Sequence, residues 1–154
     1  MKALSRCVMV LAWLTAACSE PPPLEPSKPL PPAVIQSFNG TLKPQGTDVY
    51  LFSVARAGYV EVTLLAIGPP PTVSVGLGIG RLNDTGTCEL IPIAGVNPVT
   101  AQAGPAAQVA GQVTNSGTFC VTIYDVGNLS GPTLYTMTVA HPCDDSTVRC
   151  PEPE

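Results

Sequence analysis

The sequence predicts an all-β fold, an antiparallel β-sandwich of the jelly-roll or immunoglobulin-like type with about seven or eight short strands. Three observations support this class. Apolar and polar residues alternate with a period of two after residue 33, turn residues recur at short intervals, and 18 prolines and 14 glycines accompany only 12% charged residues. Short alternating runs bounded by Gly, Pro, Asn or Asp are typical of strands.

The first half of the domain contains three such runs, at 48–54, 58–67 and 72–79. "DVYLFSV" places Tyr, Phe and Val on one face, "GYVEVTLLAI" places Val and Leu opposite Glu and Thr, and "TVSVGLGI" alternates apolar residues with Ser and Gly. The turns "KPQGT", "ARAG", "GPPP" and "LNDTGT" separate or follow them, with residues suited to turn dihedral angles.

The second half contains two clear runs, "GTFCVTIYD" at 117–125 and "LYTMTVA" at 134–140, around the turn "VGNLSGP". The stretch "PVTAQAGPAAQVAGQV" is rich in alanine, but its internal Gly and Pro argue against a helix. We expect part of it to be a loop and 107–113 to be a short strand that ends at the turn "TNSG".

The first 17 residues have the pattern of a secretory leader. Lys2 and Arg6 precede an apolar run of ten residues, 8–17. That run is too short for a membrane-spanning helix, which needs roughly 20 apolar residues. We therefore expect a signal peptide at 1–17 that is absent from the mature protein.

The leader ends in "LTAAC", which resembles the lipobox of bacterial lipoproteins, with Thr15 where that family usually has Leu. The resemblance implies that Cys18 carries lipid, that it becomes the first mature residue, and that Ser19 after it directs sorting to the outer membrane. Two or three acyl chains bind a membrane firmly, whereas one binds it only marginally. Cleavage by an ordinary signal peptidase after Ala17 is the alternative.

The number of cysteines favours the lipid. Six are present, namely Cys7, Cys18, Cys88, Cys120, Cys143 and Cys150. Loss of the first with the leader and lipidation of the second leave four, an even number for disulfides in an oxidising compartment. We favour the pairs Cys88–Cys120 and Cys143–Cys150; a zinc site built from all four is the alternative, but no closely spaced C-x-x-C pair is present.

Residues 18–32 form the predicted tether. Seven of the twelve residues 21–32 are proline, which lacks an N–H and fixes φ, so the segment suits extended polyproline II. At ~3.1 Å per residue it spans roughly 35–40 Å and would hold a domain away from a lipid surface. The remaining chain divides into a sandwich domain at 33–141 and an acidic tail at 142–154 that a disulfide closes.

Two long stretches carry a further resemblance: "FNGTLKPQGTDVYLFSVARAGYVEVTL" and "SGTFCVTIYDVGNLSGPTLYTMTV". Across 34–140 the chain resembles the bacterial pre-peptidase C-terminal domain, in which a strand ending in Gly-Thr-Leu precedes an Asp and an aromatic-alternating strand. The matching residues are Asp48, Tyr50, Phe52, Val54, Gly117, Phe119, Val121, Tyr135 and Val139. Such domains accompany exported proteases and other enzymes, and in some members they bind calcium or matrix proteins. The resemblance therefore implies a β-sandwich and an accessory or binding role.

No motif for catalysis is present, so we expect the protein not to be an enzyme. His141 is the single histidine and follows the last predicted strand. The chain lacks G-x-S-x-G, H-E-x-x-H and a catalytic Cys–His arrangement. Cofactors are not expected. A calcium site at Asp48, Asp84 and Asp125 is the one exception left open, because these acids fall in turns or at strand ends where oxygen ligands can converge.

The predicted function is that of a non-enzymatic, lipid-anchored cell-envelope protein that presents a β-sandwich for binding or structural support. Loss of Lys2 and Arg6 changes the formal net charge from −4 to −6, which disfavours nucleic acid as a partner. Two alternatives remain: a module that binds glycan, peptide or matrix through the outward-facing Tyr59 and Tyr124, and an accessory domain that docks on a separate exported hydrolase.

Overall fold

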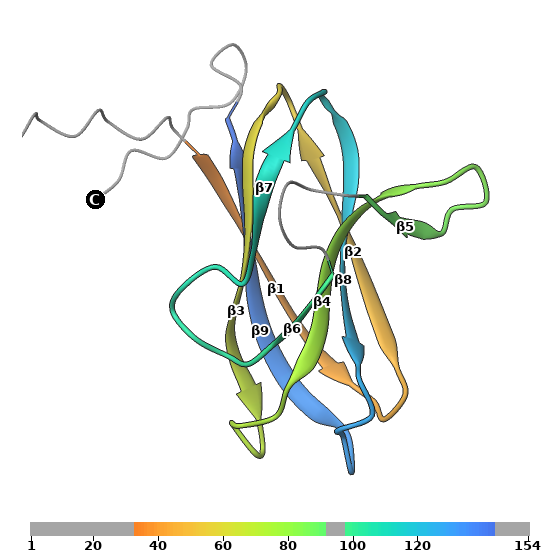
Figure 1. Ribbon diagram of the computed structural model, residues 1–154, viewed down its shortest axis with the longest axis vertical. Helices are drawn as coiled ribbons and strands as arrows, with labels where there is room; N and C mark the ends of the chain where they lie inside the picture. Colours follow the sequence, from red (N-terminus) through yellow and green to blue (C-terminus); the bar gives the residue numbers. More distant parts are fainter. Residues whose placement is uncertain (1–32, 92–97, 144–154) are drawn as a thin grey trace, which may run out of the picture. The chain divides into compact units, whose positions relative to one another are not determined.

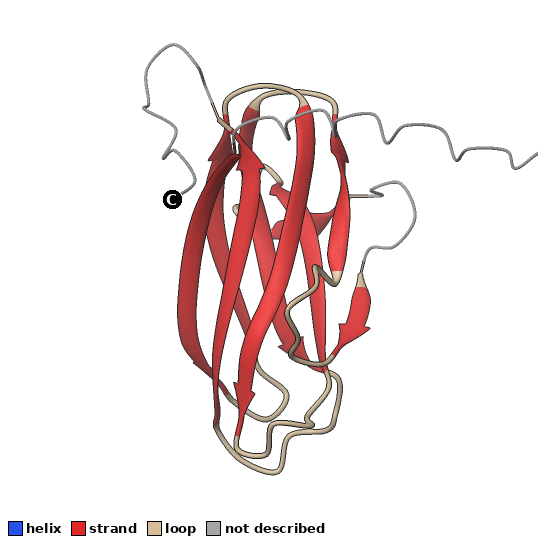
Figure 2. Ribbon diagram, turned by 90° about the vertical axis from the view of Figure 1, so that its left-hand side faces the viewer, coloured by secondary structure: helices blue, strands red, loops and turns tan. Residues whose placement is uncertain are grey.

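The computed structural model describes residues 33–91 and 98–143, which form nine strands and no helix (Figures 1 and 2). Since these ranges contain no helix at all, they include none that is long and apolar enough to cross a membrane. The strands pair into two antiparallel sheets that pack face to face. The predicted all-β sandwich is confirmed.

Sheet A has four strands in the order β1-β9-β3-β7. Their bounds are Ala33–Leu42 for β1, Thr133–Pro142 for β9, Gly58–Gly68 for β3 and Val109–Val113 for β7. The pairing of β1 with β9 runs through ten residues of each strand without interruption. β3 has a bulge beside Leu65, where its register with β9 shifts.

Sheet B has five strands, with β2, β8, β4 and β5 in that order and β6 also paired with β4. Their bounds are Thr47–Val54 for β2, Gly117–Asp125 for β8, Val75–Leu82 for β4, Cys88–Leu90 for β5 and Val99–Ala101 for β6. The two shortest strands both pair with β4, at opposite ends of it.

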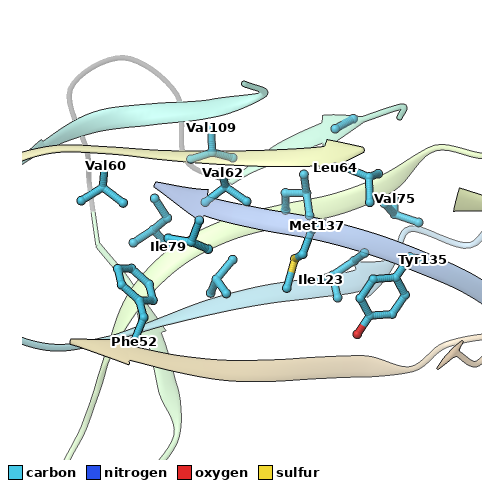
Figure 3. Close-up of a cluster of buried hydrophobic side chains, with 14 of the residues drawn as sticks. Phe52, Val60, Val62, Leu64, Val75, Ile79, Val109, Ile123, Tyr135 and Met137 are labelled. Carbon is cyan, nitrogen blue, oxygen red and sulfur yellow. The ribbon is translucent and has the colours of Figure 1, made fainter. Parts of the chain in front are cut away.

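The core lies between the sheets because each long strand turns alternate side chains inward. Val60, Val62 and Leu64 of β3 are fully buried, and they face inward residues of sheet B such as Ile79 and Ile123 (Figure 3). The exposed fraction of most of these side chains is zero. Burial of this apolar surface is the main force that holds the two sheets together.

The sandwich domain begins and ends at the same end of the sandwich. In the β1–β9 register, Ala33 pairs with Pro142, whereas Leu42 pairs with Thr133 at the other end. We call the end with Ala33 and Pro142 the terminal end, and the end with Leu42 and Thr133 the distal end. The turns 43–46 and 126–132 lie at the distal end, where the Asp125 N–H bonds the Gly46 carbonyl oxygen at 3.0 Å.

Most of the strands agree with the sequence pattern, and three points correct it. The strand predicted at 72–79 begins later, at Val75, and continues to Leu82. It begins later because the prolines before it make a turn in which the Val73 N–H reaches the Pro70 carbonyl oxygen at 3.4 Å. The strands β5 and β6 are not predicted at all. The described residues therefore hold nine strands instead of seven or eight.

Candidate functional site

Several predicted features lie outside the described residues. These are the leader 1–17, the tether 18–32 with the lipidation site Cys18, and Cys150 of the second predicted disulfide. Cys143 lies just after β9 and is buried, with 1% of its surface exposed. The anchor and the Cys143–Cys150 pairing stay predictions.

The other predicted disulfide, Cys88–Cys120, is confirmed, with an S–S distance of 2.07 Å and Cα atoms 5.9 Å apart. It joins β5 to β8 across β4, which lies between them in sheet B. Glycine at position 80 makes this crossing feasible, because a Cβ there would lie 2.9 Å from the Cys88 Sγ and closer still to the Glu89 carbonyl oxygen. Sulfurs joined in a disulfide are not free to bind zinc, so a site built from all four cysteines is excluded.

The calcium candidates do not gather at one place. Asp48 lies in β2, Asp84 in the turn between β4 and β5, and Asp125 at the end of β8. Within residues 33–91 and 98–143, no three His, Cys, Asp or Glu side chains are close enough together to hold a metal ion.

Asp125 instead ties together two turns at the distal end. Its Oδ2 accepts a hydrogen bond from the Gln45 N–H at 2.8 Å. Its Oδ1 accepts from three N–H groups of the following turn, those of Gly127, Asn128 and Leu129, at 2.9, 2.9 and 3.2 Å. These bonds, that from Gln45 foremost, hold the pKa of Asp125 below its usual value. The carboxylate of Asp125 therefore has a structural role, because it holds the two turns together.

Asp48 has a structural partner as well. The Tyr135 hydroxyl donates to the Asp48 Oδ2 at 2.7 Å and lies 2.8 Å from the Tyr50 hydroxyl. The Tyr50 hydroxyl in turn donates to the Asn39 carbonyl oxygen at 3.1 Å. Burial, followed by the neighbours Tyr50 and Asp48, raises the pKa of Tyr135. The network links β2 of sheet B to β9 of sheet A. The sequence pattern does not reveal it, because Tyr135 lies far along the chain from Asp48 and Tyr50.

His141 is buried at the terminal end, with 4% of its surface exposed and its ring centroid 5.6 Å from that of Phe52. Its Nδ1 lies 3.3 Å from the Pro142 carbonyl oxygen, which can only accept, so this nitrogen carries the hydrogen. The Nε2 atom is buried and has no hydrogen-bond partner among the described residues. Desolvation is the main cause that lowers the pKa of His141, and it outweighs the Pro142 bond.

From this burial we expect the stability of the domain to depend on pH. The pKa of His141 is lower in the folded chain than its unfolded value of about 6.5, so the unfolded state binds more protons as the pH falls. We expect the free energy of unfolding to be constant above about pH 6.5 and to fall below it, by up to about 1.4 kcal/mol per pH unit, until the folded pKa is passed. Chemical unfolding followed by circular dichroism between pH 7.5 and pH 5 measures this.

His141→Gln is the matched control, because glutamine does not titrate and the carboxylates are common to both proteins. The variant should have a nearly flat stability profile over the same range. Equal slopes in the two proteins between pH 6.5 and pH 5 would show that His141 is not the group responsible.

The two tyrosines proposed as ligand contacts lie on different sheets. Tyr59, 57% exposed, lies on the outer face of β3 in sheet A and pairs with Gln112 of β7. Tyr124 lies on β8 in sheet B, where its ring covers Gly76 so closely that a Cβ on that glycine would collide with it. Because the outer faces of the two sheets point in opposite directions, these rings do not form one aromatic platform.

A residue that the sequence reasoning missed, Arg81, lines a shallow pocket of about 270 Å³ at the terminal end. It continues the inward-facing series of β4, after Leu77 and Ile79, and its guanidinium carbon lies 4.5 Å from the centroid of the Phe119 ring. The available signal was a charged residue at the next position of an apolar series with period two.

No protein-family model matches the chain, and no curated protein matches it.

Proposed function

We propose that this chain is a non-enzymatic, lipid-anchored protein of the bacterial cell envelope, attached to the outer membrane at Cys18. Its β-sandwich binds or supports other components of the envelope in the periplasm or outside the cell. The observation that carries the proposal is "LTAAC" at the end of an apolar leader, followed at once by a proline-rich tether and then by a sandwich domain.

The geometry of the sandwich supports a tethered role. β1 begins at Ala33, directly after the tether, and Ala33 pairs with Pro142 at the terminal end. A domain held at this end presents its other end, with the turns 43–46 and 126–132, away from the lipid. Asp125 braces those two turns through four N–H bonds, which gives the presented end a defined shape.

Two further observations support a role without catalysis. The single histidine is buried against Phe52, and among the described residues it forms a hydrogen bond with a backbone carbonyl group. The carboxylates of Asp48 and Asp125 are engaged by a tyrosine and by backbone N–H groups. We also propose kinship with the pre-peptidase C-terminal domains, supported by strands at Thr47–Val54 and Gly117–Asp125 where that resemblance expects them.

The anchor is tested by replacing Cys18 with alanine in the full chain. We expect the wild-type protein in the membrane fraction and Cys18→Ala in the soluble fraction, because the thioether-linked acyl chains supply the membrane affinity. Mass spectrometry of the wild-type protein should show a mature N-terminus at residue 18 that carries the added mass of the acyl groups.

Cys7→Ala is the control, because it removes a cysteine of the leader and leaves the attachment site intact; it should stay in the membrane fraction. Cys18→Ala that remains membrane-bound, or a wild-type protein with an unmodified thiol at position 18, would refute the anchor.

A further inference from the structure

Arg81 is a charged residue on the inward-facing side of a core strand. The positions two, four and six residues earlier in β4 are Ile79, Leu77 and Val75, all fully buried in the core. Arg81 follows them on the same face but is only half-buried, at the end of the strand. The side chain therefore begins at the edge of the apolar core and ends at the surface, beside the pocket.

The guanidinium of Arg81 lies over an aromatic ring and has no anionic partner among residues 33–91 and 98–143. It lies over the fully buried ring of Phe119, the residue directly across from it on β8, and a cation over the face of an aromatic ring is attracted to it. Glu89 lies opposite on β5, yet its carboxylate does not form an ion pair with Arg81. Within the described residues, the guanidinium N–H groups of Arg81 make no hydrogen bond.

The pocket beside this guanidinium suits a small ligand with one acidic group. Ile91, Val113 and Phe119 form its apolar lining. The polar residues that line it besides the arginine are uncharged, and they include Thr114 and Asn115. A volume of about 270 Å³ holds a group the size of a substituted ring. Apolar walls with a few convergent polar groups are the usual composition of a ligand site.

We infer that this pocket, the Arg81 pocket, binds the carboxylate of a small organic acid. The Phe119 ring lies against one side of the guanidinium. The planar fork of N–H donors in an arginine side chain matches the two oxygens of a carboxylate in a bidentate contact. The apolar part of the ligand then packs on Ile91 and Val113. One cation suits a monoanion, and the net negative charge of the chain disfavours polyanions.

This inference does not rest on the membrane anchor. The Arg81 pocket is formed by β4, by β8, by residue 91 and by the end of β7 with the turn after it, all within the sandwich. A failed anchor test therefore leaves it unchanged, and a failed binding test leaves the anchor unchanged.

The test uses benzoate as the probe and benzamide as its uncharged match, titrated into the ¹⁵N-labelled full chain and followed by NMR. We expect saturable benzoate-dependent shifts at the amides of Thr114, Asn115 and Phe119, with a dissociation constant in the millimolar range because a single partly open charge pair contributes modestly. Benzamide should bind at least ten-fold more weakly. Raised ionic strength should weaken the benzoate complex alone.

Three variants separate the site from general electrostatic attraction. Arg81→Gln should reduce benzoate affinity at least ten-fold, and Arg81→Lys should recover part of it, because lysine keeps the charge but not the planar fork. Lys43→Gln removes the same charge from an exposed distal turn and should leave binding unchanged. Equal binding of benzoate and benzamide, shifts spread outside the pocket, or an equal loss in Lys43→Gln would each overturn the inference, and the first two need no variant.

Discussion

Replacing Phe119 with alanine should lower the free energy of unfolding by about 3–5 kcal/mol, the usual range for removal of a buried phenylalanine. Phe119 is fully buried and is among the largest side chains of the core. Its ring stacks on that of Phe52, with centroids 5.9 Å apart. The same ring also contacts the guanidinium of Arg81. The substitution therefore removes apolar contact, leaves a cavity between the sheets and frees a cation.

Urea unfolding followed by far-ultraviolet circular dichroism measures the change in Phe119→Ala. Tyr59→Ala is the matched control, because it also truncates an aromatic strand residue, but one that is 57% exposed. Substitutions at exposed positions usually change stability by about 0.5 kcal/mol or less. Similar losses in the two variants would show that Phe119 does not pack between the sheets as described.

The long strands could be predicted from the sequence because each turns one face to the core. The strand β8 coincides with the predicted 117–125, and the short strand β7 lies within the predicted 107–113. In both, apolar residues at every second position are buried, so a period of two is visible in the chain itself. The fold class follows from local pattern to this extent.

The strands β5 and β6 could not be predicted in this way, because three residues are too few to show a period. Their pairing with β4 is set by contacts outside the segments themselves. For β5 these are the bond of Cys88 to Cys120 and the close approach to Gly80. The Cys88–Cys120 pair could be predicted from the sequence, but the strand that it fastens and the approach to Gly80 become visible only when the fold brings distant segments together.

The candidate site was less predictable than the fold, for a related reason. The sequence pattern predicts that Tyr59 and Tyr124 point outward. Because the chain passes repeatedly from one sheet to the other, this pattern does not show on the outer face of which sheet each side chain lies. The Arg81 pocket needs residues from β4, β7 and β8, from the turn after β7 and from position 91. Only the tertiary structure places those segments side by side.

Loss of the Cys88–Cys120 disulfide should lower the free energy of unfolding by about 3–4 kcal/mol, from the chain-entropy relation for a closed loop of this length. The two cysteines are 32 positions apart in sequence, so the bond removes much of the freedom of the unfolded chain. It also fastens β5, which otherwise pairs with β4 through only three residues. Alanine is the suitable replacement at position 120, because this side chain is fully buried and a serine would bury a hydroxyl group there.

The two single variants and the double variant together identify the bond as the cause. Either Cys88→Ala or Cys120→Ala breaks the whole disulfide, so each should lose about as much stability as the double variant, and the losses should not add. Urea unfolding of all three under identical oxidising conditions measures this. Losses that add would mean that the two cysteines stabilise the domain through separate packing contacts and not through their bond. Non-additive losses would show that the disulfide itself stabilises the domain. It crosses β4 at Gly80 and fastens the edge strand β5 to sheet B.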